Sequence, residues 1–180
     1  MIHPIVTFGH DVLREPAKPV AEVTDAIRQL VQDMLETMYA SKGVGLAAEQ
    51  IGRTERVCVI DVPHDAEKED CREENAAVPM PLVLINPEIL ASEGKQRNEE
   101  GCLSFPEISA PITRADKVTA TFLDLTGARQ TVTARGLLSR AIQHEADHLN
   151  GVLLVDKMSA MQKMSVAGQL KRLQKRAKEA

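Results

Sequence analysis

The sequence predicts an α+β protein in which antiparallel sheets pack around one central helix, with a further helix at the C-terminus. Runs rich in β-branched residues occupy the middle of the chain, over 56–61, 81–90 and 117–134. Apolar residues with helical spacing follow in two later segments, over 137–149 and 160–178. Strands followed by helices are typical of this fold class, whereas regular alternation of the two would predict a parallel sheet.

Length and composition indicate an ordinary globular protein. The 180 residues, 43% of them hydrophobic, are expected to form a single domain over 1–180. Only 2% are aromatic and none is Trp, which argues against recognition of single-stranded nucleic acid by stacking. The three Cys are too widely spaced for a disulfide framework, and no segment resembles a signal peptide or a membrane span. We therefore expect a cytoplasmic protein without membrane contact.

Charge is unevenly distributed along the chain. The net charge is −4, but residues 157–180 carry seven basic residues and one acidic residue, which leaves −10 for residues 1–156. A basic C-terminal helix on an acidic body suggests a polyanionic partner. A solvated helix kept soluble by its lysines is the simpler alternative.

The N-terminal part predicts one strand and one helix. Residues 2–8 form a short apolar run that suits an edge strand, where Pro4 limits its pairing. Thr24 is a suitable N-cap for a helix over 25–42, whose apolar residues recur at three- and four-residue spacing.

The segment GVGLAAEQIG, residues 43–52, is expected to approach another part of the molecule closely. Its two glycines bracket Val44 and precede small side chains, so little keeps the backbone away from a neighbour. No strand precedes it and the third glycine of a dinucleotide fingerprint is missing, so a nucleotide site is not expected. Gln50 is the neutral polar side chain of the segment that is suited to donate a hydrogen bond.

The central part predicts strands separated by one charged segment. Cys58 lies in the strand over 56–61 and is expected to be a small buried apolar residue. Residues 64–75 are charged without periodicity and predict an exposed loop in which neither His64 nor Cys71 has a function. The run over 117–134 predicts a β-hairpin that turns near Leu125 to Ala128.

The helix over 137–149 contains His-Glu-x-x-His. His144 and His148 are four residues apart and therefore share one helix face, where both imidazoles can bind one metal ion. Glu145 points about 100° further round the helix, beside such an ion, where a carboxylate can accept a proton from water. A solvated polar face of an ordinary amphipathic helix is the alternative.

Two histidines need a third ligand. The standard zinc-protease patterns are incomplete, because Leu154 stands where one class has His and the sole downstream Glu, Glu179, lies in the basic helix. Cys102, in the upstream segment EGCLS, is a better third ligand. Two His and one Cys leave one tetrahedral position open, as catalytic sites do, and a thiolate suits Fe²⁺ as well as Zn²⁺. Considered alone, Cys102 would be interpreted as a buried, inert thiol.

Together, GVGLAAEQ, EGCLS and QHEADH resemble the three signature motifs of peptide deformylases, and the resemblance covers nearly the whole chain. That family removes the formyl group from the N-terminal formyl-methionine of nascent chains. The resemblance implies one ion per chain, Fe²⁺ with Zn²⁺, Ni²⁺ or Co²⁺ as substitutes. It implies the following roles: Cys102, His144 and His148 as metal ligands, Glu145 as general base and acid, and the Gln50 side chain and Leu103 N–H as oxyanion donors.

Further expectations concern the substrate and neighbouring residues. The Gly45 backbone is expected to pair with an extended peptide, and Val44, Leu137 and Ala141 to line a pocket for the Met side chain. Glu49 departs from the family, where many members have Pro or a small polar residue, and this puts substrate preference in question. A buried Glu100 would need a charged partner, for which Arg114 is our hypothesis.

Partners and alternative functions complete the predictions. We expect a monomer that contacts the ribosome through its basic C-terminal helix. An ordinary zinc endopeptidase is one alternative. The other is a metal-stabilised module without catalysis that binds an RNA-rich surface.

Overall fold

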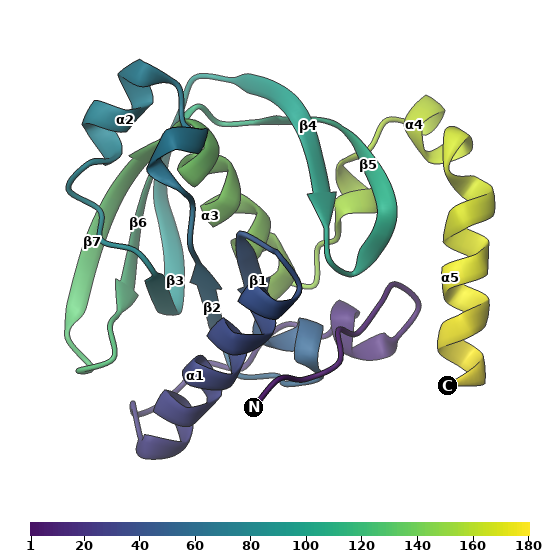
Figure 1. The fold of residues 1–180 in the computed structure, drawn as a ribbon, viewed down its shortest axis with the longest axis horizontal. Coiled ribbons are helices and arrows are strands. Elements are labelled where there is room, and N and C mark those ends of the chain that lie inside the picture. Colours follow the sequence, from purple (N-terminus) through teal and green to yellow (C-terminus); the bar gives the residue numbers. More distant parts are fainter.

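All neighbouring strands in the computed structural model, which describes residues 1–180, run antiparallel (Figure 1). The larger sheet has the order β1-β2-β3-β6-β7, and β4 and β5 form a separate two-stranded sheet. The strands are β1 (Gly45–Ala47), β2 (Val57–Ile60), β3 (Leu82–Glu93), β4 (Gln96–Cys102), β5 (Phe105–Arg114), β6 (Lys117–Leu123) and β7 (Arg129–Arg135). The helices are α1 (Asp25–Ala40), α2 (Glu69–Asn75), α3 (Gly136–Leu149), α4 (Ala160–Ser165) and α5 (Ala167–Glu179).

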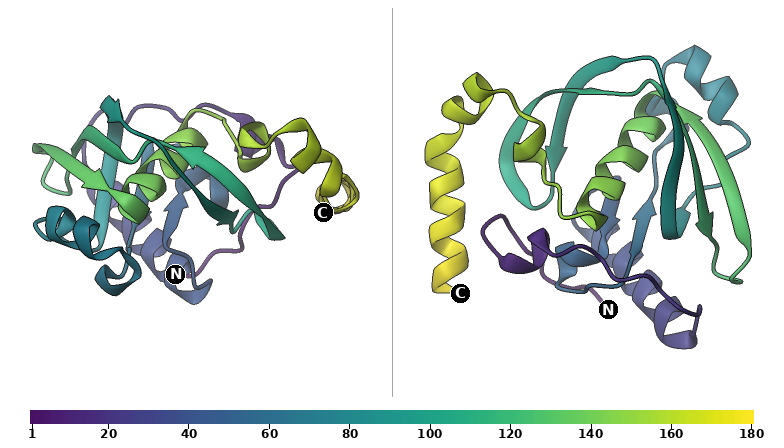
Figure 2. Two further views of the ribbon diagram at one scale, coloured as in Figure 1. Left: turned by 90° about the horizontal axis from the view of Figure 1, so that it is seen from above. Right: turned by 180° about the vertical axis from the view of Figure 1, so that it is seen from behind.

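α3 lies between the two sheets (Figures 1 and 2). Its apolar face, with Leu138, Ile142 and Leu149, is buried in a cluster with residues of β2, β3, β6 and β7. Its opposite, polar face meets β4 and β5 through His144 and its neighbours. The helix is amphipathic, but both of its faces are buried, which places its polar side chains inside the protein.

Two further apolar clusters complete the interior. α1 packs through Val31, Met34 and Met38 against β1 and β2. β5 packs against the N-terminal segment, where the rings of Phe8 and Phe105 stack with centroids 5.0 Å apart. Leu173 of α5 belongs to the same cluster, so the C-terminal helix is attached to the body of the protein beside the N-terminal loop (Figure 2).

Several sequence predictions are confirmed. The fold is α+β, with a mixed helical and antiparallel architecture around α3. Thr24 caps α1 by accepting a hydrogen bond from Ile27 N at 3.4 Å, and Ser159 caps α4 by accepting one from Gln162 N at 3.1 Å. The hairpin of β6 and β7 pairs Lys117 with Arg135 at its open end.

Other predictions are wrong, each for a tertiary reason. Residues 2–8 form no strand, because Val6 N bonds to Gln50 O and Phe8 N to Ser104 O, two acceptors on different segments. The C-terminal helix is interrupted at Val166, and the new direction brings α5 onto the cluster around β5. Residues 64–75 are mostly exposed, as expected, but they are not a loop: they form a short 3₁₀ helix and α2, with Cys71 buried, because Glu67 and Asn75 bond to Leu137 and Arg135.

None of the helices combines the length and apolar character that a membrane span requires.

Candidate metal centre and active site

Two segments bring three metal-ligating side chains together. α3 carries His144 and His148 on one face, with ring centroids 4.9 Å apart. Cys102 ends β4, where the register with β5 shifts after Gly101 and the chain turns into β5. The ligand atoms of the three residues all lie within 4.8 Å of one another, and Cys102 Sγ is 3.3 Å from His148 Nε2.

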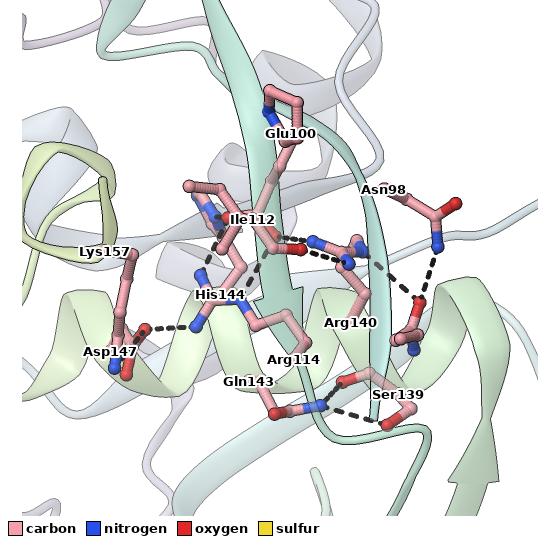
Figure 3. A network of polar contacts seen from close by, with 12 residues as sticks. Asn98, Glu100, Ile112, Arg114, Ser139, Arg140, Gln143, His144, Asp147 and Lys157 are labelled. Atoms are coloured by element: carbon pink, nitrogen blue, oxygen red, sulfur yellow. Dashed lines mark hydrogen bonds and ion pairs between the residues drawn. The ribbon is translucent and has the colours of Figure 1, made fainter. Parts of the chain in front are cut away.

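Glu100 orients the first of these histidines (Figure 3). Its Oε2 lies 2.8 Å from His144 Nδ1, which leaves Nε2 of that ring free to face Cys102. Arg114 donates to both carboxylate oxygens, at 2.7 and 3.1 Å, so the expected pairing of Glu100 with Arg114 is confirmed. Burial alone would raise the pKa of Glu100, but hydrogen bonds from His144 and Arg114 outweigh it and hold that pKa well below its usual range.

The network extends to residues that the sequence did not single out. Arg140 donates to Glu100 Oε1 at 2.7 Å and to Ile112 O at 2.8 Å. Arg114 also donates to Asp147, the residue before His148 (Figure 3). Arg140 precedes His144 by four residues, so helical spacing could have assigned it to the same face. Nothing in the sequence marks Asp147.

Glu145 is enclosed beside the three ligands. It is 4% exposed, and its Oε2 has no hydrogen-bond partner. Burial raises the pKa of its carboxyl to about 7. Gly45 lies directly against it, since a Cβ at that position would come within 2.5 Å of Glu145 Oε1. The expected close approach of the glycine segment is therefore to this carboxylate.

Gln50 is held with its amide N–H toward Cys102. Its Oε1 accepts a hydrogen bond from Ala47 N at 3.0 Å, so its Nε2 faces the other way. That nitrogen donates to Ser104 Oγ at 3.1 Å and lies 3.6 Å from Cys102 Sγ. The N–H of Leu103, on the turn between β4 and β5, donates to no backbone carbonyl.

Glu49 lies beside Gln50 but outside the site. Its side chain is fully buried, neither carboxylate oxygen has a partner, and burial raises its pKa to about 8. It does not line the cavity described below, so the departure from the family at this position has no direct contact through which to alter substrate choice.

A cavity of about 680 Å³ opens beside the cluster. Gln50, Cys102, His144 and Glu145 lie in its wall. His148 stays behind that wall, in the interior. The four residues expected to bind a peptide, Val44, Gly45, Leu137 and Ala141, also line it, as does Leu103, the expected oxyanion donor.

These residues fit a transition-metal ion. Three donor atoms converge, one thiol sulfur and two imidazole nitrogens, and all of them are common ligands of transition metals. The open side faces the cavity, and Glu145 supplies a carboxylate next to it. Two imidazoles, one thiol and an adjacent base around an open position define a metal-dependent hydrolase.

Comparison with known proteins gives the family. A family model described as polypeptide deformylase matches residues 2–164. A peptide deformylase of Acidobacterium capsulatum is 45% identical over 175 residues, 97% of each chain. Crystal structures of peptide deformylases from Legionella pneumophila and Plasmodium falciparum superimpose with TM-scores of 0.82 and 0.86, at 40% and 33% identity. Each match covers 98% of this chain. The matches cover 99% of the Legionella chain and 98% of the Plasmodium chain.

The chain belongs to the polypeptide deformylase family. It is a hydrolase that removes the N-formyl group from nascent polypeptides, which is the known role of the family. Peptide deformylases are metalloenzymes, in agreement with the cluster of Cys102, His144 and His148. The alternatives of an endopeptidase and of a non-catalytic module are thereby set aside.

Proposed function

We propose that Cys102, His144 and His148 bind one Fe²⁺ ion, with Zn²⁺, Ni²⁺ or Co²⁺ as substitutes, and that this centre hydrolyses formyl-Met peptides. The observation that carries the proposal is the convergence of the three ligand atoms next to the buried Glu145. One thiolate among the ligands suits Fe²⁺ as well as Zn²⁺. When bound there, the ion supplies a Lewis acid that polarises the formyl oxygen and lowers the pKa of water from 15.7 to about 7.

Glu145 is the proton carrier in this proposal. It accepts a proton from the water that attacks the formyl carbon and returns it to the nitrogen as the C–N bond breaks, which releases formate and a free amine. Burial, which raises the pKa of this carboxyl above its usual value, favours both uptake and return of the proton near neutral pH. General acid–base catalysis of this kind contributes about 10²- to 10⁴-fold.

Two donors are available for the oxyanion of the tetrahedral intermediate. Gln50 Nε2 is oriented by the bond between its Oε1 and Ala47 N. The Leu103 N–H has no backbone acceptor of its own and lies in the cavity wall. Donors of this type stabilise a transition state by roughly 3 kcal/mol each.

The peptide itself would bind along β1. This strand ends the larger sheet, so one of its edges is unpaired and can accept an extended peptide as an added strand. Val44 and Gly45 lie at that edge and line the cavity. Leu137 and Ala141, one turn apart on α3, would pack against the Met side chain.

The basic C-terminal helix is proposed to contact the ribosome. α5 carries five Lys and Arg residues and follows the part of the chain that the family model matches. Since substrates emerge at the ribosome, RNA would be the polyanionic partner there. We propose in addition that the protein is cytoplasmic, because nascent chains are its substrates, and that it acts as a monomer, because one chain supplies all three ligands and the cavity lining.

The proposed roles can be tested by formate release from a formyl-Met tripeptide, with protein purified anaerobically with Fe²⁺ and its metal content assayed in parallel. Glu145→Gln should keep the ion and lose activity, whereas Glu69→Gln, an exposed glutamate on α2, should behave as the wild type. Full activity of Glu145→Gln would refute the role of this residue. An active protein with no metal would refute the proposed centre.

A further inference from the structure

The first turn of α3 has no capping residue of its own. Arg135 occupies the N-cap position without a side-chain hydrogen bond to the helix, and the turn contains no acidic residue. An α-helix leaves its first N–H groups unpaired and its N-terminus partly positive. In this protein the missing cap comes from a residue far away in the sequence.

Glu67, from the charged segment over 64–75 that includes α2, supplies that cap. Its Oε2 accepts a hydrogen bond from Leu137 N at 2.8 Å, and its Oε1 accepts one from Leu138 N at 2.6 Å. The side chain is 5% exposed, so both bonds are shielded from water. One carboxylate therefore satisfies two helix donors and lies at the positive end of the helix.

A second residue of the same segment secures this contact. Asn75 donates to Glu67 Oε1 at 3.1 Å and to Arg135 O at 2.9 Å, and it accepts from Arg135 N at 2.9 Å. Gly136 makes the close packing possible, because a Cβ there would lie 2.5 Å from Glu67 Oε2 and 2.8 Å from Cys71 Sγ. Figure 1 shows α2 beside the start of α3.

We propose that Glu67 is a positioning residue that sets the methionine pocket by holding the first turn of α3. Leu137, whose N–H Glu67 binds, lines the cavity, and so does Ala141 one turn further on. The inference rests on the proposed assignment of these two residues to the pocket. It gives the charged segment over 64–75 a function in substrate binding.

The effect should be on substrate binding more than on the chemical step. His144 lies two turns after Leu137 and is held separately by Glu100. A change at Glu67 would therefore loosen the pocket wall while the ligand cluster stays in place. Loss of binding that is common to substrate and transition state raises KM and leaves kcat nearly unchanged.

The test compares Glu67→Gln with Glu69→Gln, the exposed control on the same segment. KM for a formyl-Met tripeptide should rise in Glu67→Gln, by up to about fivefold if the roughly 1 kcal/mol that a helix cap contributes is all lost from substrate binding. The value of kcat and the metal content should stay close to wild type, and the preference for formyl-Met over formyl-Ala peptides should narrow. Glu69→Gln should change none of these.

Hydrogen exchange gives a readout that is independent of activity. The amides of Leu137 and Leu138 should exchange faster in Glu67→Gln and remain protected in Glu69→Gln. Glu67→Asp keeps the charge but is one methylene shorter, so it should raise KM above wild type by less than about fivefold, and it provides the test if the glutamine variant does not fold.

Two results would overturn the proposal: a lowered melting temperature with unchanged KM and selectivity, or equal losses of kcat and metal. A wild-type protein that releases no formate would instead refute the proposed roles of the metal centre, and the exchange result would still decide whether Glu67 holds α3.

Discussion

The Glu100 carboxylate lies 2.8 Å from Nδ1 of His144, and Arg114 and Arg140 both donate to it. One buried acid therefore fixes the ring orientation of a metal ligand, and two buried cations fix the acid. Such indirect partners of a metal are worth about 10- to 100-fold in affinity.

Arg114→Ala should weaken metal retention by about tenfold. It should also destabilise the protein by about 3 kcal/mol, since it leaves the buried Glu100 with Arg140 as its remaining arginine partner. Metal content after dialysis and the midpoint of denaturant unfolding measure the two effects. Arg28→Ala removes a surface arginine paired with an exposed aspartate and is the matched control. Normal metal content and stability in Arg114→Ala would contradict this prediction.

Gly45→Ala should inactivate the enzyme without removing the metal. The new methyl group would come within 2.5 Å of Glu145 Oε1 and would displace that carboxylate. A misplaced base should lower kcat by about 10²-fold, the lower end of what general acid–base catalysis contributes. Gly168→Ala is the control. A Cβ added at Gly168 would lie 3.6 Å from its nearest neighbour, a nitrogen of Arg172, so this variant should remain active. A kcat equal to that of the wild type in Gly45→Ala would contradict this prediction, because the methyl group would then not have impaired Glu145.

Val44→Asp should change which peptides are accepted. The side chain is 42% exposed at the edge of β1 and lines the cavity, so a carboxylate there would face the bound substrate. The ratio of kcat/KM for formyl-Met over a peptide with a polar first residue should fall about tenfold, within the range for altered apolar contacts. An unchanged ratio would place the pocket elsewhere.

Glu49→Gln should remove a pH dependence of stability. The pKa of this carboxyl is about 8 in the folded protein, against 4.5 for a free side chain, because it is buried without a partner. Between pH 4.5 and pH 8 the folded state binds more protons than the unfolded state. The free energy of unfolding therefore falls as pH rises, by up to about 1.4 kcal/mol per pH unit.

Denaturant unfolding from pH 5 to 9 would measure this slope. Glu49→Gln should flatten it and raise stability above pH 8, while Glu69→Gln should leave it as in the wild type. Identical curves for Glu49→Gln and wild type would mean that the carboxyl is not buried in its neutral form.

Charge reversal on α5 should weaken ribosome binding. Deletion of 160–180 would be ambiguous, because Leu173 belongs to the apolar cluster around β5. Lys175 and Arg176 are exposed, and changing both to Glu leaves that cluster intact. Co-sedimentation with ribosomes should fall and lose part of its salt dependence. Lys95→Glu, on the exposed end of the β3–β4 connection, is the control. Binding that is insensitive to the double change would exclude α5 as the contact.

Local patterns were sufficient for the elements that carry the chemistry. The apolar periodicity over 137–149 predicted α3, and the spacing of His144 and His148 on that helix predicted a shared metal-binding face, since i and i+4 lie on the same side of a helix. The caps at Thr24 and Ser159 were predictable because the capping residue and the N–H it binds are three residues apart.

The sequence by itself thus determined the fold class, the three motifs and the ligand set they imply. Only the tertiary structure decided how Glu67 caps α3, how Arg140 and Asp147 join the network of Glu100, and why position 45 must be Gly. In each of these cases the partners are remote in the chain or lie on different elements. Contacts of that kind depend on how the elements pack, and spacing along the chain carries no information about them.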